Sequence, residues 1–347
     1  MNSSSPIEEA VEAAAAYIEF QRCADGLWRD FHTLAGSSSD WVTGFVSYAI
    51  TSSDLLKESI LDALKTLLYR QRSNGGWSYN ETVPTDCDST AWVLLSLSTA
   101  PTWKPSAIRR AIQYVKSHCD ASLGGFSTYA VSDRIDRFIG ASDQSLTHGW
   151  LGVHTCVTGV AIQSLLVHGE PLRSEIVHNA TSYLLQKREV SGVWRSYWWK
   201  GYGYSTYHAL RALSMVRALN IQEARRASRF LLSRQQEDGS WSDGPGEESG
   251  VFSTAFILLS LLLFPDEEIL KAAERGISWL LQCQNSDGSW PTVPILRIPP
   301  PMIKEPESVE EWRLNREGTG VIIEDSARLF TSAAALWALS VFKSLTA

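Results

Sequence analysis

Hydrophobic positions along the chain form two alternating kinds of segment. In the first kind, apolar residues recur at spacings of three and four, as in residues 60–68 and 277–281. That spacing is typical of a helix with one buried face. Segments of the second kind are apolar nearly all round, as helices buried on every side are, and they cover roughly residues 40–52, 87–99, 154–167, 204–217, 251–264 and 325–343. The pattern predicts an all-α chain in which outer and inner helices alternate.

A short repeat marks the end of each outer helix. The pattern QxxxGxW occurs at residues 71–77, 235–241 and 284–290, and looser copies close on Trp28, Phe126 and Trp194. The Gly that follows Asp or Asn in these copies is a helix-ending signal. Six copies of one helix-turn-helix unit therefore fill the chain. We expect twelve helices to close into a single (α/α)6 barrel domain spanning residues 1–347, with a long loop at 291–324 that is a candidate lid.

Composition and charge narrow the classes of function. The chain is 44% hydrophobic and 20% charged, as globular proteins with a sizeable core are. Its net charge is −7 and its Lys and Arg residues are not clustered, which disfavours nucleic-acid binding. Five cysteines without metal-ligand spacing, and a start that lacks the basic region of a signal peptide, predict a cytoplasmic protein with reduced thiols. The apolar residues 293–298 leave a peripheral membrane contact open.

The N-terminal ends of the inner helices are expected to meet at one mouth of the barrel. Asp, Ser and Thr at any one of these ends are explained equally well as helix N-caps. Taken together, however, the six ends are rich in acidic and aromatic residues, which favours a functional site there. The ends comprise Asp40-Trp41, Asp86 to Thr90, His154 to Cys156, Tyr202 to Tyr204, Glu248-Ser249 and Glu324-Asp325.

Two motifs carry a resemblance to a known family. The repeats together with Asp86-Cys87-Asp88-Ser89-Thr90-Ala91 resemble the class II terpene cyclases of the squalene-hopene cyclase family, whose DxDDTA motif supplies the acid that protonates an alkene. Residues 192–206 are similar to the GSWxGRWGxNYxYGT segment that lines the cavity in that family. The resemblance covers the whole chain but only one of the two barrels of squalene-hopene cyclases. It implies a monodomain cyclase, an isomerase that protonates the terminal alkene of a linear polyprenyl substrate, free or aryl-linked as in meroterpenoids, and directs a carbocation cascade.

The resemblance also implies roles for individual residues. Asp88 corresponds to the proton donor, with Asp86 and Ser89 as its hydrogen-bonding supports. Burial and a neighbouring carboxyl group are what keep such an acid protonated at neutral pH. Ser89 replaces the second Asp of the family's DD pair, and the family's histidine that bonds the catalytic Asp corresponds to Val160, so that His154, earlier on the same helix, is the candidate to replace it.

The remaining candidates are aromatic residues near the mouth. Aromatic faces stabilise a carbocation by about 0.5 to 2 kcal/mol each, and a dry cavity protects it from water. With His154, the expected substrate-binding residues are Trp41, Trp198, Tyr202, Tyr204, Tyr207, Phe252 and Phe330. The expected partner is a small-molecule isoprenoid, with no obligatory protein partner.

Other functions stay open on sequence grounds. Protein prenyltransferase β-subunits use a related barrel to hold zinc, and Asp86, Asp88 and His154 would be an O,O,N ligand set. A non-catalytic isoprenoid-binding barrel is a third possibility, because fold does not imply function. A glycosidase would pair Asp88 with Glu248 or Asp325; we rank it last because the mouth is aromatic rather than polar.

Cofactor expectations follow from the leading hypothesis. Protonation-initiated cyclisation requires no metal or redox cofactor. Mg²⁺ would assist if the substrate carried a diphosphate, and the nearest cationic side chains are then Lys200, Arg297 and Arg328.

Overall fold

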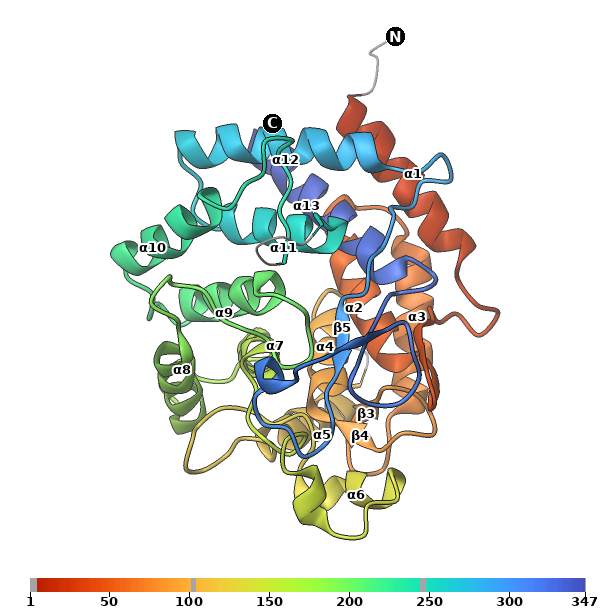
Figure 1. The fold of residues 1–347 in the computed structure, drawn as a ribbon. Helices are drawn as coiled ribbons and strands as arrows, with labels where there is room; N and C mark the ends of the chain where they lie inside the picture. The colour runs from red at the N-terminus through yellow and green to blue at the C-terminus, as the bar shows by residue number, and fades with distance from the viewer. Residues whose placement is uncertain (1–4, 101–103, 244–247, 347) are drawn as a thin grey trace.

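Inner and outer helices alternate along the chain in the computed structural model, which describes residues 5–100, 104–243 and 248–346 (Figure 1). The outer helices are α1 (Pro6–Phe20), α3 (Lys57–Arg70), α5 (Pro105–Lys116), α8 (Glu175–Lys187), α10 (Ile221–Leu232) and α12 (Glu267–Cys283). The inner helices are α2 (Asp40–Ile50), α4 (Cys87–Leu97), α7 (Thr155–Val167), α9 (Gly203–Met215), α11 (Val251–Leu261) and α13 (Leu329–Thr346). The prediction of an all-α barrel with two concentric rings is confirmed.

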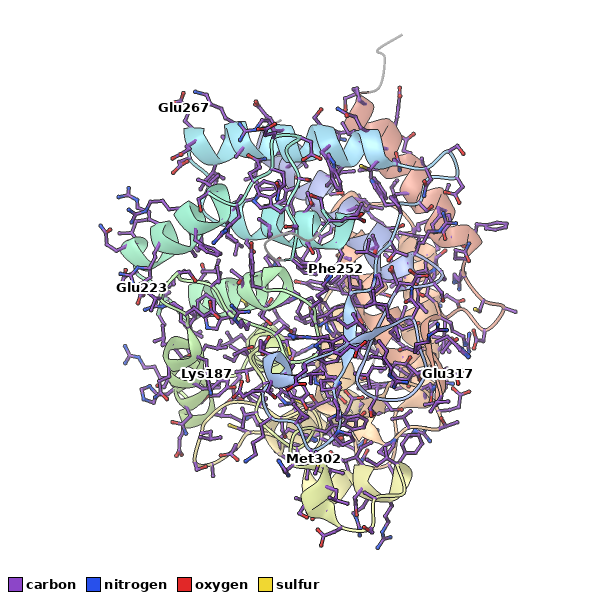
Figure 2. All side chains as sticks on the ribbon, in the orientation of Figure 1. Lys187, Glu223, Phe252, Glu267, Met302 and Glu317 are labelled. Atoms are coloured by element: carbon purple, nitrogen blue, oxygen red, sulfur yellow. The ribbon has the colours of Figure 1, made fainter. Side chains whose placement is uncertain are left out.

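The inner helices form a closed ring. Each packs on the next in the order α2, α4, α7, α9, α11, α13, and α13 packs back on α2. Their residues are buried on nearly every side, which explains their uniformly apolar sequences. Figure 2 shows Phe252 of α11 inside the molecule and Glu223 and Glu267 of the outer helices at its periphery.

The repeat glutamines join each turn to the next outer helix. The Gln71 side-chain amide donates to the carbonyl of its own repeat glycine and to that of Ala107 in α5, both at 2.8 Å. Gln235 makes the equivalent pair of hydrogen bonds. Gln284 donates to the carbonyl of Ala10 at 2.9 Å and so links the last repeat to the first helix.

The repeat tryptophans join the outer helix to the inner one. The Trp77 indole N–H donates to the carbonyl of Leu67 in α3 at 2.6 Å, and its backbone N–H donates to the Thr90 hydroxyl in α4 at 2.9 Å. Trp28, Trp194, Trp241 and Trp290 make the same two kinds of bond. Trp suits the position because it combines a large apolar ring with a donor that is satisfied when buried. Phe126 fills the same position in its copy and keeps only the backbone bond, to the Thr158 hydroxyl at 2.8 Å.

The repeat glycine at 75 allows a close approach of two backbones. Gly75 has a φ of +95°, and a Cβ there would lie 2.7 Å from the carbonyl oxygen of Arg110 in α5. We expect Gly75→Ala to lower the free energy of unfolding by about 2 kcal/mol or more, because backbone strain and steric overlap add. Gly140→Ala is the matched control, since Gly140 has a φ of +67° but no atom within 4 Å of the added Cβ. Urea denaturation of both variants checks this; equal losses would show that the close approach contributes nothing.

Two buried carboxyl groups fix the start of α13, Asp30 from the connection after α1 and Asp325 from the residues just before the helix. Asp30 accepts hydrogen bonds from the backbone N–H groups of Ala327 and Leu329, both at 2.9 Å. Asp325 accepts from the backbone N–H and hydroxyl of Thr331 at 2.6 and 2.8 Å, and from the Thr292 hydroxyl. Desolvation raises the pKa of Asp30 to about 6 and that of Asp325 to about 7.

The short strands lie in the connections between helices. β1 (Asp30–Thr33) pairs with β2 (Gly36–Ser38), and β3 (Trp77–Ser78) pairs with β4 (Thr85–Asp86). The long segment 291–324 carries a three-stranded sheet in the order β5 (Leu296–Ile298), β7 (Val321–Ile323), β6 (Arg313–Leu314). The sequence predicted only a loop for this segment, because strands of two or three residues leave no periodic signal.

The apolar half of this segment is fixed to the barrel. The Arg297 N–H donates to the Trp198 carbonyl at 2.7 Å, and the Trp150 indole donates to the Pro299 carbonyl at 2.9 Å. Ile295 and Leu296 are buried. These two residues are therefore not available for the peripheral membrane contact that the sequence left open, since their apolar surface is used inside the protein.

Within the described part of the chain, α13 has the length and apolar composition needed to cross a membrane, and 72% of its residues are buried inside the protein as one of the inner helices.

Candidate active site

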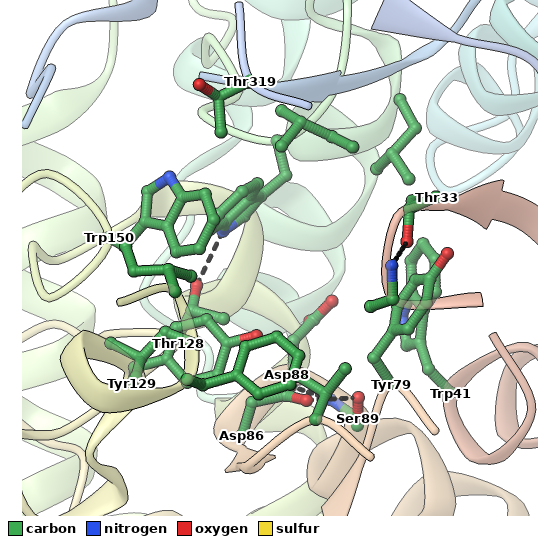
Figure 3. Close-up of a pocket in the computed structure, with 18 of the residues that line it drawn as sticks. Thr33, Trp41, Tyr79, Asp86, Asp88, Ser89, Thr128, Tyr129, Trp150 and Thr319 are labelled. Atoms are coloured by element: carbon green, nitrogen blue, oxygen red, sulfur yellow. Dashed lines mark hydrogen bonds between the residues drawn. The ribbon is translucent and has the colours of Figure 1, made fainter. Parts of the chain in front are cut away.

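A cavity of about 540 Å³ opens where the inner helices begin (Figure 3). Its wall comes from the β1–β2 hairpin, the start of α4, the connection between α5 and α7, Trp198 and the segment 291–324. Apolar and aromatic side chains predominate in it, and Asp86, Asp88 and Ser89 lie together on one side. The cavity therefore suits an apolar ligand with an acid at one wall.

Asp86 occupies the N-cap position of α4. Its Oδ1 accepts from the Ser89 backbone N–H at 2.7 Å and its Oδ2 accepts from the Ser89 hydroxyl at 2.6 Å. Desolvation raises the pKa of Asp86 to about 7, and the two bonds from Ser89 oppose that rise. The Ser89 side chain thus supports Asp86 directly, and any effect on Asp88 passes through Asp86.

Asp88 lies in the first turn of α4 and lines the cavity. Desolvation, followed by the nearby Asp86 carboxylate, raises the pKa of Asp88 well above its usual range, while Trp41 opposes the rise. Within the described residues, Asp88 Oδ1 and the Trp41 indole nitrogen are both buried without a hydrogen-bond partner. Burial and the neighbouring carboxyl group therefore favour the protonated form of Asp88, and one of its oxygens is not tied to the protein.

The expected aromatic residues divide into a cavity wall and a layer behind it. Trp41 and Trp198 line the cavity. Phe330 packs against Trp41 with ring centroids 5.0 Å apart. Behind the wall, Trp199 stacks on Tyr204 at 4.6 Å and on Phe252 at 4.9 Å. Tyr207 is buried deeper, where its hydroxyl accepts a hydrogen bond from Arg211 at 2.7 Å.

Two further expected residues lie outside the cavity wall. Tyr202 packs edge-on against Phe230 of outer helix α10 at 5.5 Å. His154 is buried, stacks on Tyr197 at 3.8 Å, and has ring nitrogens 3.1 Å from the Thr128 hydroxyl and 3.0 Å from the Gly149 carbonyl. Desolvation lowers the pKa of His154 to about 3, so the ring is neutral.

The zinc alternative lacks an assembled ligand set. In residues 5–100, 104–243 and 248–346, no group of three or more His, Cys, Asp or Glu side chains is arranged to hold a metal ion. Both ring nitrogens of His154 are engaged as just described, so Asp86, Asp88 and His154 do not form the O,O,N set.

The other carboxylates considered from the sequence lie outside the cavity wall, whereas one of the cations, Arg297, belongs to that wall together with Asp88. Asp325 is engaged with Thr292 and Thr331, and Glu248 is exposed; neither belongs to the cavity wall. Among the cations, Arg297 pairs with Glu307 and Arg328 pairs with Asp287, each at 3.0 Å. Arg297 is buried and lines the cavity beside Leu296 and Ile298.

Sequence reasoning missed four aromatic residues of the wall: Tyr79, Tyr129, Trp150, and Phe138 at the end of the short helix α6 (Ile135–Phe138). A signal existed for the first two. Tyr79 follows the closing aromatic of its repeat by two residues and Tyr129 follows Phe126 by three, just as Trp198 follows Trp194 by four. Trp150 lies in the irregular connection before α7 and has no such marker.

The closed ring of helices is the fold of the class II terpene cyclases, and a buried carboxyl group lies at its aromatic mouth. Residues 74–295 match the family model described as the squalene-hopene cyclase C-terminal domain. The chain belongs to the squalene-hopene cyclase family.

Curated relatives are longer than this chain. Lanosterol synthase of Pneumocystis carinii is 26% identical over 325 residues, which is 78% of this chain and 45% of that protein. Drimenyl diphosphate synthase of Streptomyces showdoensis is 26% identical over 245 residues, covering 68% of this chain and 42% of that protein. The chain spans less than half the length of these two relatives.

Solved structures of similar length match almost completely. A variant of the type II terpene cyclase MstE from Scytonema, in complex with geranylgeranyl dihydroxybenzoate, is 27% identical with a TM-score of 0.88, covering 98% of each chain. A protein from Actinoplanes is 28% identical with a TM-score of 0.85, covering 97% of this chain and 99% of that one.

Proposed function

We propose that this protein is a terpene cyclase in which Asp88 protonates the terminal alkene of a linear polyprenyl substrate and the cavity directs the carbocation cascade that follows. The observation that carries the proposal is the Asp88 carboxyl group, which has an unpartnered oxygen at the wall of an aromatic cavity and whose pKa is raised by burial. Asp86 and Ser89 support it, because the Asp86 charge makes ionisation of Asp88 costly.

The chemistry requires these features together. An alkene is a very weak base, so the acid must be desolvated and its proton must not be shared with a protein acceptor. The alkene π electrons take the Asp88 proton and leave a cation at the adjacent carbon, which the next alkene of the chain attacks. Loss of a proton at the end gives a cyclic isomer, and the Asp88 carboxylate is reprotonated from solvent. No metal or redox step enters this balance.

Wall aromatics are suited to stabilise the cations. Trp41 and Trp198 lie directly in the wall, where the face of each indole can contribute about 0.5 to 2 kcal/mol. Tyr204, Tyr207, Phe252 and Phe330 act behind them, since they fix the position of the wall and exclude water. Tyr202 and His154 take no direct part in binding in this proposal.

The substrate class is proposed from the cavity and the relatives. A cavity of about 540 Å³ lies in the range that holds single small-molecule ligands. Because MstE was solved with geranylgeranyl dihydroxybenzoate, we propose a polyprenyl chain joined to an aromatic head group. A polyprenyl diphosphate is the second choice, in view of the drimenyl diphosphate synthases, and Mg²⁺ would then assist. Action in the cytoplasm belongs to the same proposal.

The proposal is tested by isotope labelling. Purified protein is incubated in D2O with linear isoprenoids that are free, diphosphorylated or aryl-linked, and products are read by mass spectrometry. We expect a cyclic isomer that carries one carbon-bound deuterium from one substrate class, because the initiating proton comes from an exchangeable acid. Absence of any cyclic isomer with every substrate would refute cyclisation. If a substrate then bound without reacting, an isoprenoid-binding barrel would be favoured.

A further inference from the structure

A line of hydrogen bonds runs from the cavity wall into the protein behind it. The Trp198 indole N–H donates to the Thr128 hydroxyl at 2.6 Å (Figure 3). The same hydroxyl lies 3.1 Å from Nδ1 of His154, and Nε2 of His154 lies 3.0 Å from the Gly149 carbonyl. The Gly149 N–H in turn donates to the Pro301 carbonyl at 2.9 Å. Four separate parts of the chain are joined in this way.

The chemistry of the groups fixes the direction of every hydrogen bond. An indole nitrogen only donates and a carbonyl only accepts. The Gly149 carbonyl therefore requires a proton on Nε2 of His154, which leaves Nδ1 of the neutral ring as an acceptor. Thr128 has one hydroxyl proton and gives it to Nδ1, so its oxygen receives the indole proton. Each polar group in the line is satisfied by this single arrangement.

We propose that His154, as its Nε2–H tautomer, is a positioning residue that acts through the Thr128 hydroxyl to hold the Trp198 indole in the cavity wall. The inference rests on the proposed function for its effect on products, but the hydrogen-bond line itself does not. His154 has no contact with substrate in this arrangement.

The surroundings of His154 make it a rigid anchor. The residue is 4% exposed, and its ring lies nearly parallel to that of Tyr197, with centroids 3.8 Å apart and an interplanar angle of 15°. Burial lowers the pKa of His154 to about 3, in keeping with a ring that stays neutral. The Tyr197 hydroxyl donates to the Ile303 carbonyl at 2.7 Å, so the stacked pair is itself tied to the segment 291–324.

Trp198 needs such an anchor because packing alone leaves it partly free. It is only half-buried, and Trp150 touches it in a tilted arrangement at 5.6 Å. Tyr197 and the His154 ring itself meet it edge-on, at 4.9 and 5.9 Å, so neither stacks on its face. A cation is stabilised only when the face of the ring lies within about 6 Å. A rotated indole would present its edge, which is the positive rim of the ring. Thr128 therefore determines whether the growing cation meets the face or the edge of the Trp198 ring. Protonation by Asp88 does not depend on Thr128.

Hydrogen exchange of the Trp198 indole N–H tests the line without any substrate. We expect slow exchange in wild type, in Thr128→Ser and in His154→Gln, whose amide can accept from Thr128 and donate to Gly149. Exchange is expected to be at least about tenfold faster in Thr128→Val and His154→Phe, which lack the acceptor and the anchor. Thr158→Val is the matched control. Thr158 is a buried residue of α7 whose hydroxyl donates to the His154 carbonyl and accepts from the Phe126 N–H, but it makes no bond to the Thr128 hydroxyl, so the indole proton should stay slow. Equal exchange in all variants would overturn the proposal.

Product analysis then tests the consequence. We expect Thr128→Val and His154→Phe to raise the ratio of incompletely to completely cyclised product by about 2- to 30-fold, the range set by one cation–π contact, while Thr128→Ser and His154→Gln retain the wild-type ratio. The double variant Thr128→Val with Trp198→Phe should match Trp198→Phe alone, because both changes remove one interaction. Additive shifts, or a shift caused equally by Thr158→Val, would contradict positioning. If wild type forms no cyclic product, the proposed function fails, and the exchange experiment still decides whether His154 holds Trp198.

Discussion

Asp88→Asn is expected to abolish cyclisation, with kcat reduced by at least about 10³-fold, while the protein remains folded and binds its substrate. Asn has nearly the shape of a protonated Asp but carries no proton acidic enough for an alkene. Since Asp88 is held neutral in the native protein, its replacement by a neutral amide removes no charge from the wall. The measurement is single-turnover product formation, with substrate affinity determined separately by calorimetry.

The matched control for this experiment is Asp325→Asn. Asp325 is a buried carboxyl group near the start of another inner helix, with a raised pKa of its own, but it lies outside the cavity wall. The Asp325→Asn variant should retain a cyclisation rate within a few-fold of the wild-type rate. Comparable activity losses in both variants would mean that Asp88 acts through stability, and substantial activity in Asp88→Asn would assign the proton to another group.

Wild-type protein is expected to lose stability as the pH rises from about 4 to 8, with Asp325 a main cause. The pKa of Asp325 is raised from 3.8 to about 7, and Asp30 beside it is raised to about 6. Between the unfolded and folded pKa values the folded state binds more protons than the unfolded state, so unfolding becomes easier with rising pH. The stabilisation is complete below pH 4 and is lost by pH 8. For Asp325 it amounts to about 2 to 4 kcal/mol.

The contribution of Asp325 is isolated by comparing how steeply the free energy of unfolding changes with pH in wild type and in a variant. Asp40, Asp86 and Asp88 have raised pKa values and act in the same direction. His154, His168 and His208, whose pKa values are lowered by burial, act in the opposite one. The free energy of unfolding is therefore measured from pH 4 to 8 for wild type and Asp325→Asn. We expect a shallower decline in the variant, whatever its absolute stability. Parallel curves would show that Asp325 titrates alike in the folded and unfolded states.

The ring of helices could be predicted from the sequence because its determinants are local and repeated. The inner helix predicted at 87–99 is observed as α4, Cys87–Leu97. The last inner helix, predicted at 325–343, begins only at Leu329. The residues of its expected first turn are not helical: they include Asp325 and part of the backbone that Asp30 binds. Arg328 there has a left-handed φ of 53°. A periodic pattern of apolar residues gives no information about such long-range hydrogen bonds.

The site could be predicted only where a motif or a helix start marked it. Asp88, Asp86 and Trp41 begin inner helices and lie in the cavity wall. Tyr202 also stands next to a helix start, but successive helix positions turn by about 100°, and its ring points to α10 instead. Trp150 belongs to an irregular connection, where sequence carries no information about direction.

Ring closure bears on how the protein is made. The last repeat bonds to the first helix through Gln284 and Ala10, and α13 packs on both α1 and α2. A ribosome adding about 5 to 20 residues per second needs roughly 15 to 60 s to pass from the end of α2 to the end of α13. Until then α2 lacks its final neighbour and presents an uncovered apolar flank. The nascent chain therefore exposes an apolar helix face throughout this interval. The ring closes only when α13 leaves the exit tunnel.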